Sequence, residues 1–224
     1  MYILLISEMN TFVCKLIFCA KIVDCESIIQ LFDNLIKKNI TQHITGLLLV
    51  YSDFMIHLIE ASEDDVFQLC HEVFTNNSSI ITNVKCLYMQ NNAKKRFFKE
   101  WYFKKMKDNT LKDDKLKELE DNFENVSSTY KAVVVDLFKL YIELWHKLQL
   151  RNYENFNEYL DIITVNGYPN IPSRRNIKFI LQSVWGYNLT TLIENYYNLN
   201  YVSNFDNYSS VSEMIQEIKH KYNE

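Results

Sequence analysis

The chain has 224 residues, of which 48% are hydrophobic, so it can bury a core and is not intrinsically disordered. Its net charge of -4 provides no overall positive field that would attract nucleic acid. Since no uninterrupted apolar run approaches the ~20 residues that a transmembrane helix needs, we also expect no membrane span. The apolar N-terminus has no basic start and is interrupted by Glu8 and Asn10, which is not typical of a signal peptide.

The hydrophobic pattern of the first half predicts strands and helices in the order β-α-β-β-α-β-β. Asp24 and Ser62 can cap the two helices, and three acidic residues follow Ser62, where the helix dipole favours them. Two apolar runs that flank Ser52-Asp53 predict a hairpin. The expected strands are 11–20, 44–51, 54–59, 80–89 and one within 97–106, and the expected helices are 25–38 and one that begins after Ser62.

This order predicts an α+β fold of the ferredoxin-like type, in which two split βαβ units place both helices on one face of a sheet. We assign it to residues 11–107, followed by a charged linker or helix at 108–130 and an all-helical C-terminal extension at 131–224. The aromatic-rich extension and the lack of positive charge favour protein partners. Its main helix, within 132–150, is amphipathic, with an apolar stripe of Val134, Leu137, Phe138, Tyr141, Leu144, Trp145 and Leu148. Shorter helices are expected near 155–164, 173–184, 189–197 and 211–222.

The chain lacks the common catalytic motifs, including GxGxxG, the P-loop, GxSxG and HExxH, so we predict that it is not an enzyme. Its five Cys form no CxxC pair and have no metal-ligand spacing, which indicates buried, reduced thiols in a cytoplasmic protein. An acylphosphatase-type site is disfavoured, because the segment 19–22 after the first strand lacks Arg and Gly. The unusual polar residues are His57 and Glu60 in the second hairpin strand, each either a satisfied core residue or part of a site.

Three short motifs resemble those of the BLUF domain, a flavin-based blue-light sensor module with a ferredoxin-like fold. The first is ITGLL at 44–48, five residues after Asn39. The second is FMIHLIEA at 54–61, and the third is RFFKEW at 96–101. They occur in the family's order, and the resemblance covers about residues 12 to 106.

The resemblance implies a flavin pocket between the two helices, where a strand Tyr, a hairpin Gln and a helix Asn contact the ring. Here Asn39 matches the Asn, whereas Phe18 stands at the Tyr position, His57 at the Gln position, and Ala61 replaces a Gly. Phe has no hydroxyl to donate, and His has ring nitrogens but no amide. Two interpretations are open: a pocket filled by Phe18 and aliphatic neighbours without a cofactor, or a site for FAD or FMN at Asn39, His57 and Phe18 without a normal photocycle.

The degenerate Tyr and Gln positions, followed by a Pro-bracketed helical tail, also resemble the testis-expressed BLUF-like proteins of sperm and cilia. This resemblance implies a structural or adaptor protein whose partners are other proteins of a ciliary or flagellar axonemal complex. The alternative is a flavin-binding sensor.

Overall fold

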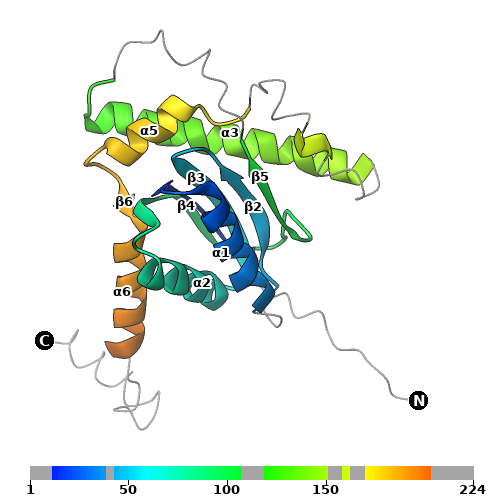
Figure 1. Cartoon of the computed structure of the whole chain (residues 1–224), viewed down its shortest axis with the longest axis horizontal. Helices are drawn as coiled ribbons and strands as arrows, with labels where there is room; N and C mark the ends of the chain where they lie inside the picture. Colours follow the sequence, from blue (N-terminus) through cyan, green and yellow to red (C-terminus); the bar gives the residue numbers. More distant parts are fainter. Residues whose placement is uncertain (1–11, 39–42, 107–118, 151–157, 162–169, 203–224) are drawn as a thin grey trace, which may run out of the picture.

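The computed structural model describes residues 12–38, 43–106, 119–150, 158–161 and 170–202. They form a six-stranded mixed sheet with the strand order β5-β2-β3-β1-β4-β6 and helices on both sides, as Figure 1 shows. In chain order the elements are β1 (Val13–Ile22), α1 (Cys25–Lys38), β2 (Thr45–Val50), β3 (Phe54–Ala61), α2 (Glu63–Asn76), β4 (Ile81–Ala93), β5 (Trp101–Lys105), α3 (Phe123–Leu150), α5 (Arg174–Gln182), β6 (Tyr187–Asn188) and α6 (Leu189–Val202).

The central part of the sheet confirms the predicted ferredoxin-like fold. Strands β2, β3, β1 and β4 are neighbours in that order and pair antiparallel, and α1 and α2 pack on the same face. Strand β1 pairs on both sides, with β3 and with β4, which explains why it is almost entirely buried. The additional strand β5 pairs parallel to β2 at the edge of the sheet.

Alternating side chains divide the sheet into two apolar faces, because successive residues of a strand point in opposite directions. On β1, Leu16 and Phe18 belong to the core under α1 and α2. Ile17 and Cys19 belong to a second core, which includes buried residues of α3 and α5. Both faces are covered, so the central strands are mostly apolar and do not alternate regularly between apolar and polar residues.

Local sequence signals place the helix starts as predicted. The Asp24 carboxylate accepts a hydrogen bond from the Ser27 amide at 2.7 Å before α1, and the Ser62 hydroxyl accepts one from the Asp65 amide at 3.2 Å before α2. These bonds satisfy amides that have no partner inside the helix.

Gly46 in the ITG motif is required by the close approach of β2 to β3. Its φ is +146°, and a Cβ atom there would lie 2.0 Å from the carbonyl oxygen of Leu58. Any side chain at this position would therefore push the two central hairpin strands apart.

The C-terminal extension agrees with the prediction in part. Helix α3 begins at Phe123, within the segment 108–130 for which a linker or a helix is predicted. Its predicted apolar stripe packs on the second core through Val134, Leu137, Phe138, Tyr141 and Leu144. Val133 and Leu140 are also buried, whereas Trp145 is 41% exposed. The extension is also not all helical, because β6 pairs with β4 through Tyr187 and Cys86. Strand β6 consists of only two residues, which is too short for an alternation pattern to predict.

The shorter helices of the extension follow the sequence in part. Helices α5 and α6 correspond to the predictions at 173–184 and 189–197, while the predicted helix at 211–222 lies outside the described residues. Only 158–161 of the predicted helix 155–164 is described, and it is helical. Helix α6 packs on α2, where the ring of Tyr196 stacks on Phe67 with centroids 3.9 Å apart. No helix in the described part of the chain is long and apolar enough to span a membrane.

Candidate functional site

The two polar residues of the second hairpin strand lie on opposite faces of the sheet. His57 and Glu60 are three positions apart on β3, so their side chains point in opposite directions. His57 lies in the core under α1 and α2, and Glu60 lies on the face that α3 covers; both are 0% exposed. They therefore form two separate polar sites.

His57 lies among aromatic rings under α1. Its ring centroid is 4.5 Å from that of Phe32 on α1 and 5.5 Å from that of Phe18 on β1, its partner residue across the β1–β3 pair. Phe74 of α2 contacts the edge of Phe18, with centroids 5.6 Å apart. The two residues that the resemblance aligned with the BLUF Tyr and Gln are thus neighbours in this structure.

One hydrogen bond fixes the tautomer of His57. The indole nitrogen of Trp101 on β5 donates to its Nε2 at 2.9 Å. A neutral imidazole that accepts at Nε2 carries its proton on Nδ1. This Nδ1 is buried without a hydrogen-bond partner among the described residues. Burial lowers the pKa of His57 from 6.5 to about 3, so the ring is neutral at physiological pH.

Three aromatic rings lie around the imidazole of His57. The ring centroids of Phe18, Phe32 and Trp101 lie 5.5, 4.5 and 6.1 Å from its own. The buried Nδ1–H of His57 is a donor to which a ligand carbonyl or nitrogen could bind. Asn39, the third predicted contact of a cofactor, lies outside the described residues.

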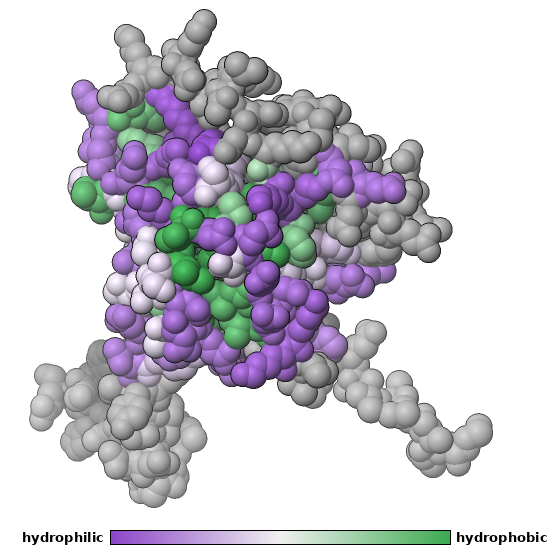
Figure 2. Space-filling view, in the orientation of Figure 1, coloured by the Kyte–Doolittle hydropathy of each residue, from purple (hydrophilic) through white to green (hydrophobic). Residues whose placement is uncertain are grey.

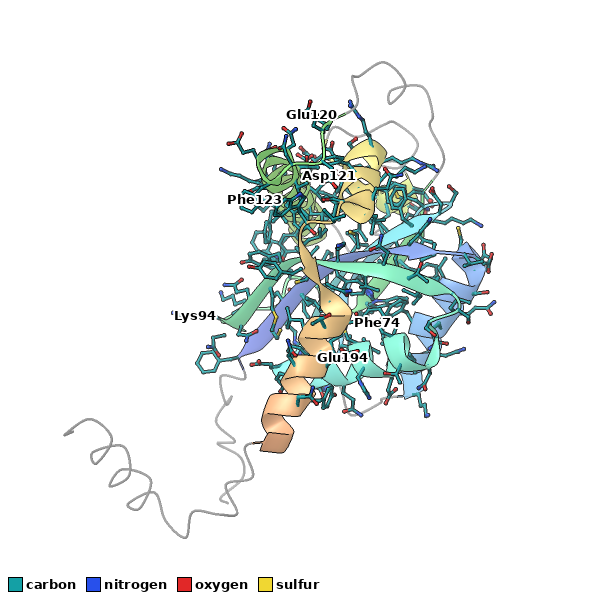
Figure 3. The ribbon with its side chains drawn as sticks, turned by 90° about the vertical axis from the view of Figure 1, so that its left-hand side faces the viewer. Phe74, Lys94, Glu120, Asp121, Phe123 and Glu194 are labelled. Atoms are coloured by element: carbon teal, nitrogen blue, oxygen red, sulfur yellow. The ribbon has the colours of Figure 1, made fainter. Side chains whose placement is uncertain are left out.

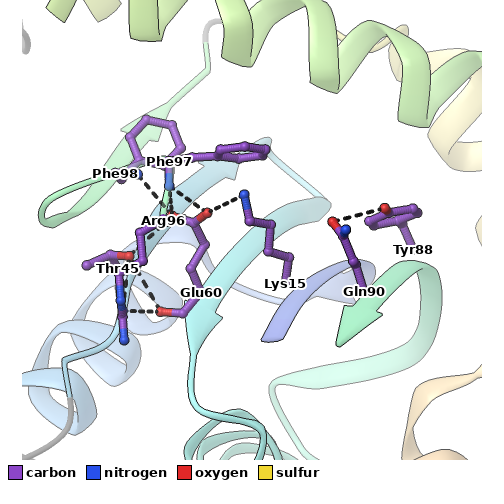
Figure 4. Close-up of polar contacts among 8 residues, drawn as sticks. All are labelled: Lys15, Thr45, Glu60, Tyr88, Gln90, Arg96, Phe97 and Phe98. Carbon is purple, nitrogen blue, oxygen red and sulfur yellow. Dashed lines mark hydrogen bonds and ion pairs between the residues drawn. The ribbon is translucent and has the colours of Figure 1, made fainter. Parts of the chain in front are cut away.

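Glu60 is the centre of a buried polar cluster on the other face (Figure 4). Its carboxylate accepts hydrogen bonds from the amides of Phe97, at 2.8 and 2.9 Å, and Phe98, at 2.9 Å. It also accepts one from the hydroxyl of Thr45 at 3.2 Å and pairs with Lys15 at 3.3 Å. Both carboxylate oxygens are therefore occupied.

Arg96 and Lys15 supply the positive charge around Glu60. Arg96 donates to the backbone oxygen of Glu60 at 2.8 Å and also to the backbone oxygen of His43, the other histidine near the hairpin. Lys15 is 3% exposed, and burial lowers its pKa to about 8 although Glu60 opposes the shift. The arrangement fixes the segment before β5.

The sequence missed several residues of both sites. Trp101 was part of the RFFKEW motif but had no predicted contact, and Phe32 was one apolar helix position among several. Three partners of Glu60, namely Arg96, Phe97 and Phe98, lie 36 to 38 residues further along the chain, so no local pattern points to them. In the described part of the chain, no group of three His, Cys, Asp or Glu side chains is placed to hold a metal ion.

The strand order and the Phe18–His57 pair define an α+β protein with a BLUF-like, ferredoxin-type sheet and a helical extension. Residues 16–198 match the family model of testis-expressed protein 47. Because the match covers most of the chain, the chain belongs to the testis-expressed protein 47 family.

Solved structures of bacterial BLUF proteins are among those similar to this chain. A bacterial light-regulated adenylyl cyclase is 25% identical over 42% of this chain and 28% of its own, with a TM-score of 0.37. The BLUF domain of BlrP1 from Klebsiella pneumoniae is 20% identical over 41% of this chain and 63% of its own, with a TM-score of 0.34. BlrB, a BLUF protein in its dark state, is 17% identical over 43% of this chain and 75% of its own, with a TM-score of 0.34.

This chain spans only about a third or less of the length of the first of these structures.

The depressed pKa of His57 predicts a specific loss of stability in acid. Below pH 6.5 the unfolded chain protonates this imidazole, while the folded chain does not until about pH 3, so stability falls as the pH falls between these values. Urea unfolding at pH 7 and pH 5 should show that the wild type loses about 2 kcal/mol more than His57→Gln. His146→Gln, which changes an exposed His, should behave like the wild type. Equal losses in the wild type and His57→Gln would show that the imidazole titrates normally in the fold.

Removal of the Glu60 carboxylate should destabilise the protein strongly. Glu60→Ala leaves a buried Lys15 and two backbone amides without a partner, so we expect the free energy of unfolding to fall by about 3–5 kcal/mol in chemical denaturation. The matched control is Asp33→Ala, which breaks the exposed pair with Lys37 and should cost less than about 1 kcal/mol. A Glu60→Ala variant as stable as the control would contradict this role.

Proposed function

We propose that this chain is a non-enzymatic structural or adaptor protein of a ciliary or flagellar axonemal complex in sperm. Its BLUF-like domain serves as a scaffold for other proteins and has no photochemistry. The observation that carries the proposal is the packing of Phe18 and Phe32 around His57, because aromatic side chains fill the position from which a BLUF Tyr and Gln would contact a flavin.

The functional groups of Phe18 and His57 support the same proposal. Phe18 has no hydroxyl that could donate a proton or serve as the electron donor of a Tyr. The neutral His57 accepts a hydrogen bond from Trp101 at Nε2, so it is held by the protein itself. Membership of a testis-expressed family agrees with a role in sperm.

A second candidate function is a flavin-binding sensor without a BLUF photocycle. One observation favours it, namely the buried Nδ1–H of His57 that has no partner among the described residues. An unpaired buried donor costs about 1–3 kcal/mol, and a ligand acceptor would remove this cost.

Fractionation of sperm tests the proposed role. After extraction of the membranes with a nonionic detergent, we expect the full-length protein to sediment with the flagellar axonemes and to be released only when the axoneme is dissolved. A soluble sperm enzyme serves as the control for complete extraction. Recovery of the protein in the detergent extract as a free monomer would contradict the adaptor role.

The absorption spectrum of the purified full-length protein tests which candidate is right. We expect a colourless protein that binds neither FAD nor FMN on incubation, because Phe18, Phe32 and Trp101 occupy the space. Near-stoichiometric flavin, identified by mass spectrometry, would favour the sensor, and Asn39→Ala should then release it. Illumination of such a complex should still produce no BLUF-type red shift, since Phe18 replaces the Tyr.

A further inference from the structure

We propose that the start of α3 and the connection from α5 to β6 form a docking surface for a basic segment of a partner protein. We name this surface the aromatic platform. It consists of Leu119, Phe123, Val184, Trp185 and Tyr187. The inference rests on the proposed adaptor function and names the chemistry of the partner.

The platform gathers large apolar side chains that the fold leaves in solvent. Phe123 is 66% exposed, Val184 is 83% exposed and Tyr187 is 77% exposed. The rings of Phe123 and Trp185 touch edge to face, with centroids 5.9 Å apart, so the two segments form one surface. In Figure 2 the left edge of the molecule, where α5 leads into β6, carries hydrophobic residues among hydrophilic ones. Exposed apolar surface of this kind marks interaction sites, and Trp and Tyr often dominate their binding energy.

The backbone under these side chains is held firmly. The carboxylate of Asp121 accepts hydrogen bonds from the Ser183 hydroxyl at 2.6 Å and from the Val184 amide at 3.2 Å. The buried Lys85 donates to the carbonyl of Trp185 at 3.4 Å. An exposed but fixed loop loses little conformational entropy when it binds a partner.

Gly186 fixes the turn in the middle of the platform. Its φ is +96°, and a Cβ atom there would lie 2.1 Å from the hydroxyl oxygen of Tyr130 on α3. The turn is thus packed directly against α3, and this packing presents Trp185 and Tyr187 on either side of the glycine. Pairing of β6 with β4 fixes the far end of the same segment.

The charge beside the platform determines the kind of partner. Glu120, Asp121 and Glu124 are exposed at the start of α3, and Figure 3 shows Glu120 and Asp121 close to Phe123. The stretches 119–130 and 179–188 contain no Lys or Arg. Asp121 already binds Ser183 and Val184, so among the described residues at the start of α3 the side chains of Glu120 and Glu124 can pair with a partner.

A basic segment with an apolar residue beside its Arg or Lys complements this surface. A guanidinium can stack on the exposed Trp185 or Tyr187 ring and pair with Glu120 or Glu124, while the apolar residue contacts Phe123 or Val184. Nucleic acid and anionic membranes carry the wrong sign of charge for these carboxylates.

The test uses the immobilised full-length protein and a phage-displayed library of random peptides. We expect enriched peptides to combine Arg or Lys with an adjacent aromatic or aliphatic residue. A labelled synthetic copy of such a peptide then reports affinity by fluorescence polarisation. Trp185→Ala with Tyr187→Ala should weaken binding at least about tenfold, as expected for hot-spot side chains. Glu120→Lys with Glu124→Lys should also weaken it by about tenfold.

Trp145→Ala is the matched control, because this Trp of α3 is 41% exposed and lies outside the platform; binding should change less than about twofold. Thermal unfolding of each variant shows whether its fold is intact. If the variant with Trp185→Ala and Tyr187→Ala does not fold, the affinity of the variant with Glu120→Lys and Glu124→Lys, whose changes are exposed, still tests the platform.

Three results would overturn the proposal. The first is the absence of enriched peptides, and the second is enrichment of acidic peptides or of peptides that bind the variants as tightly as the wild type. The third is sedimentation of the wild type as a dimer that the Tyr187→Ala variant dissociates, because the platform would then bind a second copy of this chain. Sperm fractionation is independent of all three, so failure of the platform is distinguishable from failure of the adaptor function.

Discussion

The buried carboxylate of Glu60 joins the hairpin to the segment that leads into the last strand of the BLUF-like sheet. By holding the amides of Phe97 and Phe98, it fixes where β5 begins, and β5 then pairs with β2. Trp101, the first residue of β5, lies on the α1 and α2 face and donates a hydrogen bond to His57 there. The environment of His57 therefore depends on a charge cluster on the other face of the sheet, and a carboxylate whose two oxygens are both occupied in this way has a structural role.

Burial shifts the pKa values of several side chains in the interior of the protein. Burial raises the pKa of Cys14 to about 12 and that of Cys86 to about 11, so these thiols stay protonated and unreactive. His57 stays neutral for the same reason. Lys15 differs from these groups, because burial lowers its pKa to about 8, within reach of neutral pH, while its ammonium group pairs with Glu60.

Local sequence signals predicted the helices and strands of this fold, whereas the contacts between residues far apart in the chain came from the structure. Helical spacing and the capping residues Asp24 and Ser62 gave the first two helices, and the apolar runs gave the central strands. The family resemblance aligned Phe18 and His57 with the Tyr and Gln positions, but their pairing and the hydrogen bond from Trp101 came from the structure. The stripe predicted for α3 is buried at Leu137, Tyr141 and Leu144, whereas Trp145 near the end of the helix is 41% exposed, because helical spacing does not show where the covering partner ends. The partners of Glu60 lie on three other segments of the chain, so no periodicity indicates them.

The second core has a consequence for the synthesis of this protein. Ile17 near the start of the chain packs in the same core as Ile177 and Leu181 of α5. The sheet through β5 is made well before α5, because about 70 residues separate Lys105 from Arg174, which takes roughly 3.5–14 s of translation. During that interval α3 is the one described helix that can cover this face, so the part of the second core that α5 completes is exposed and prone to aggregation. A chain that ends before α5 keeps this part of the apolar face exposed.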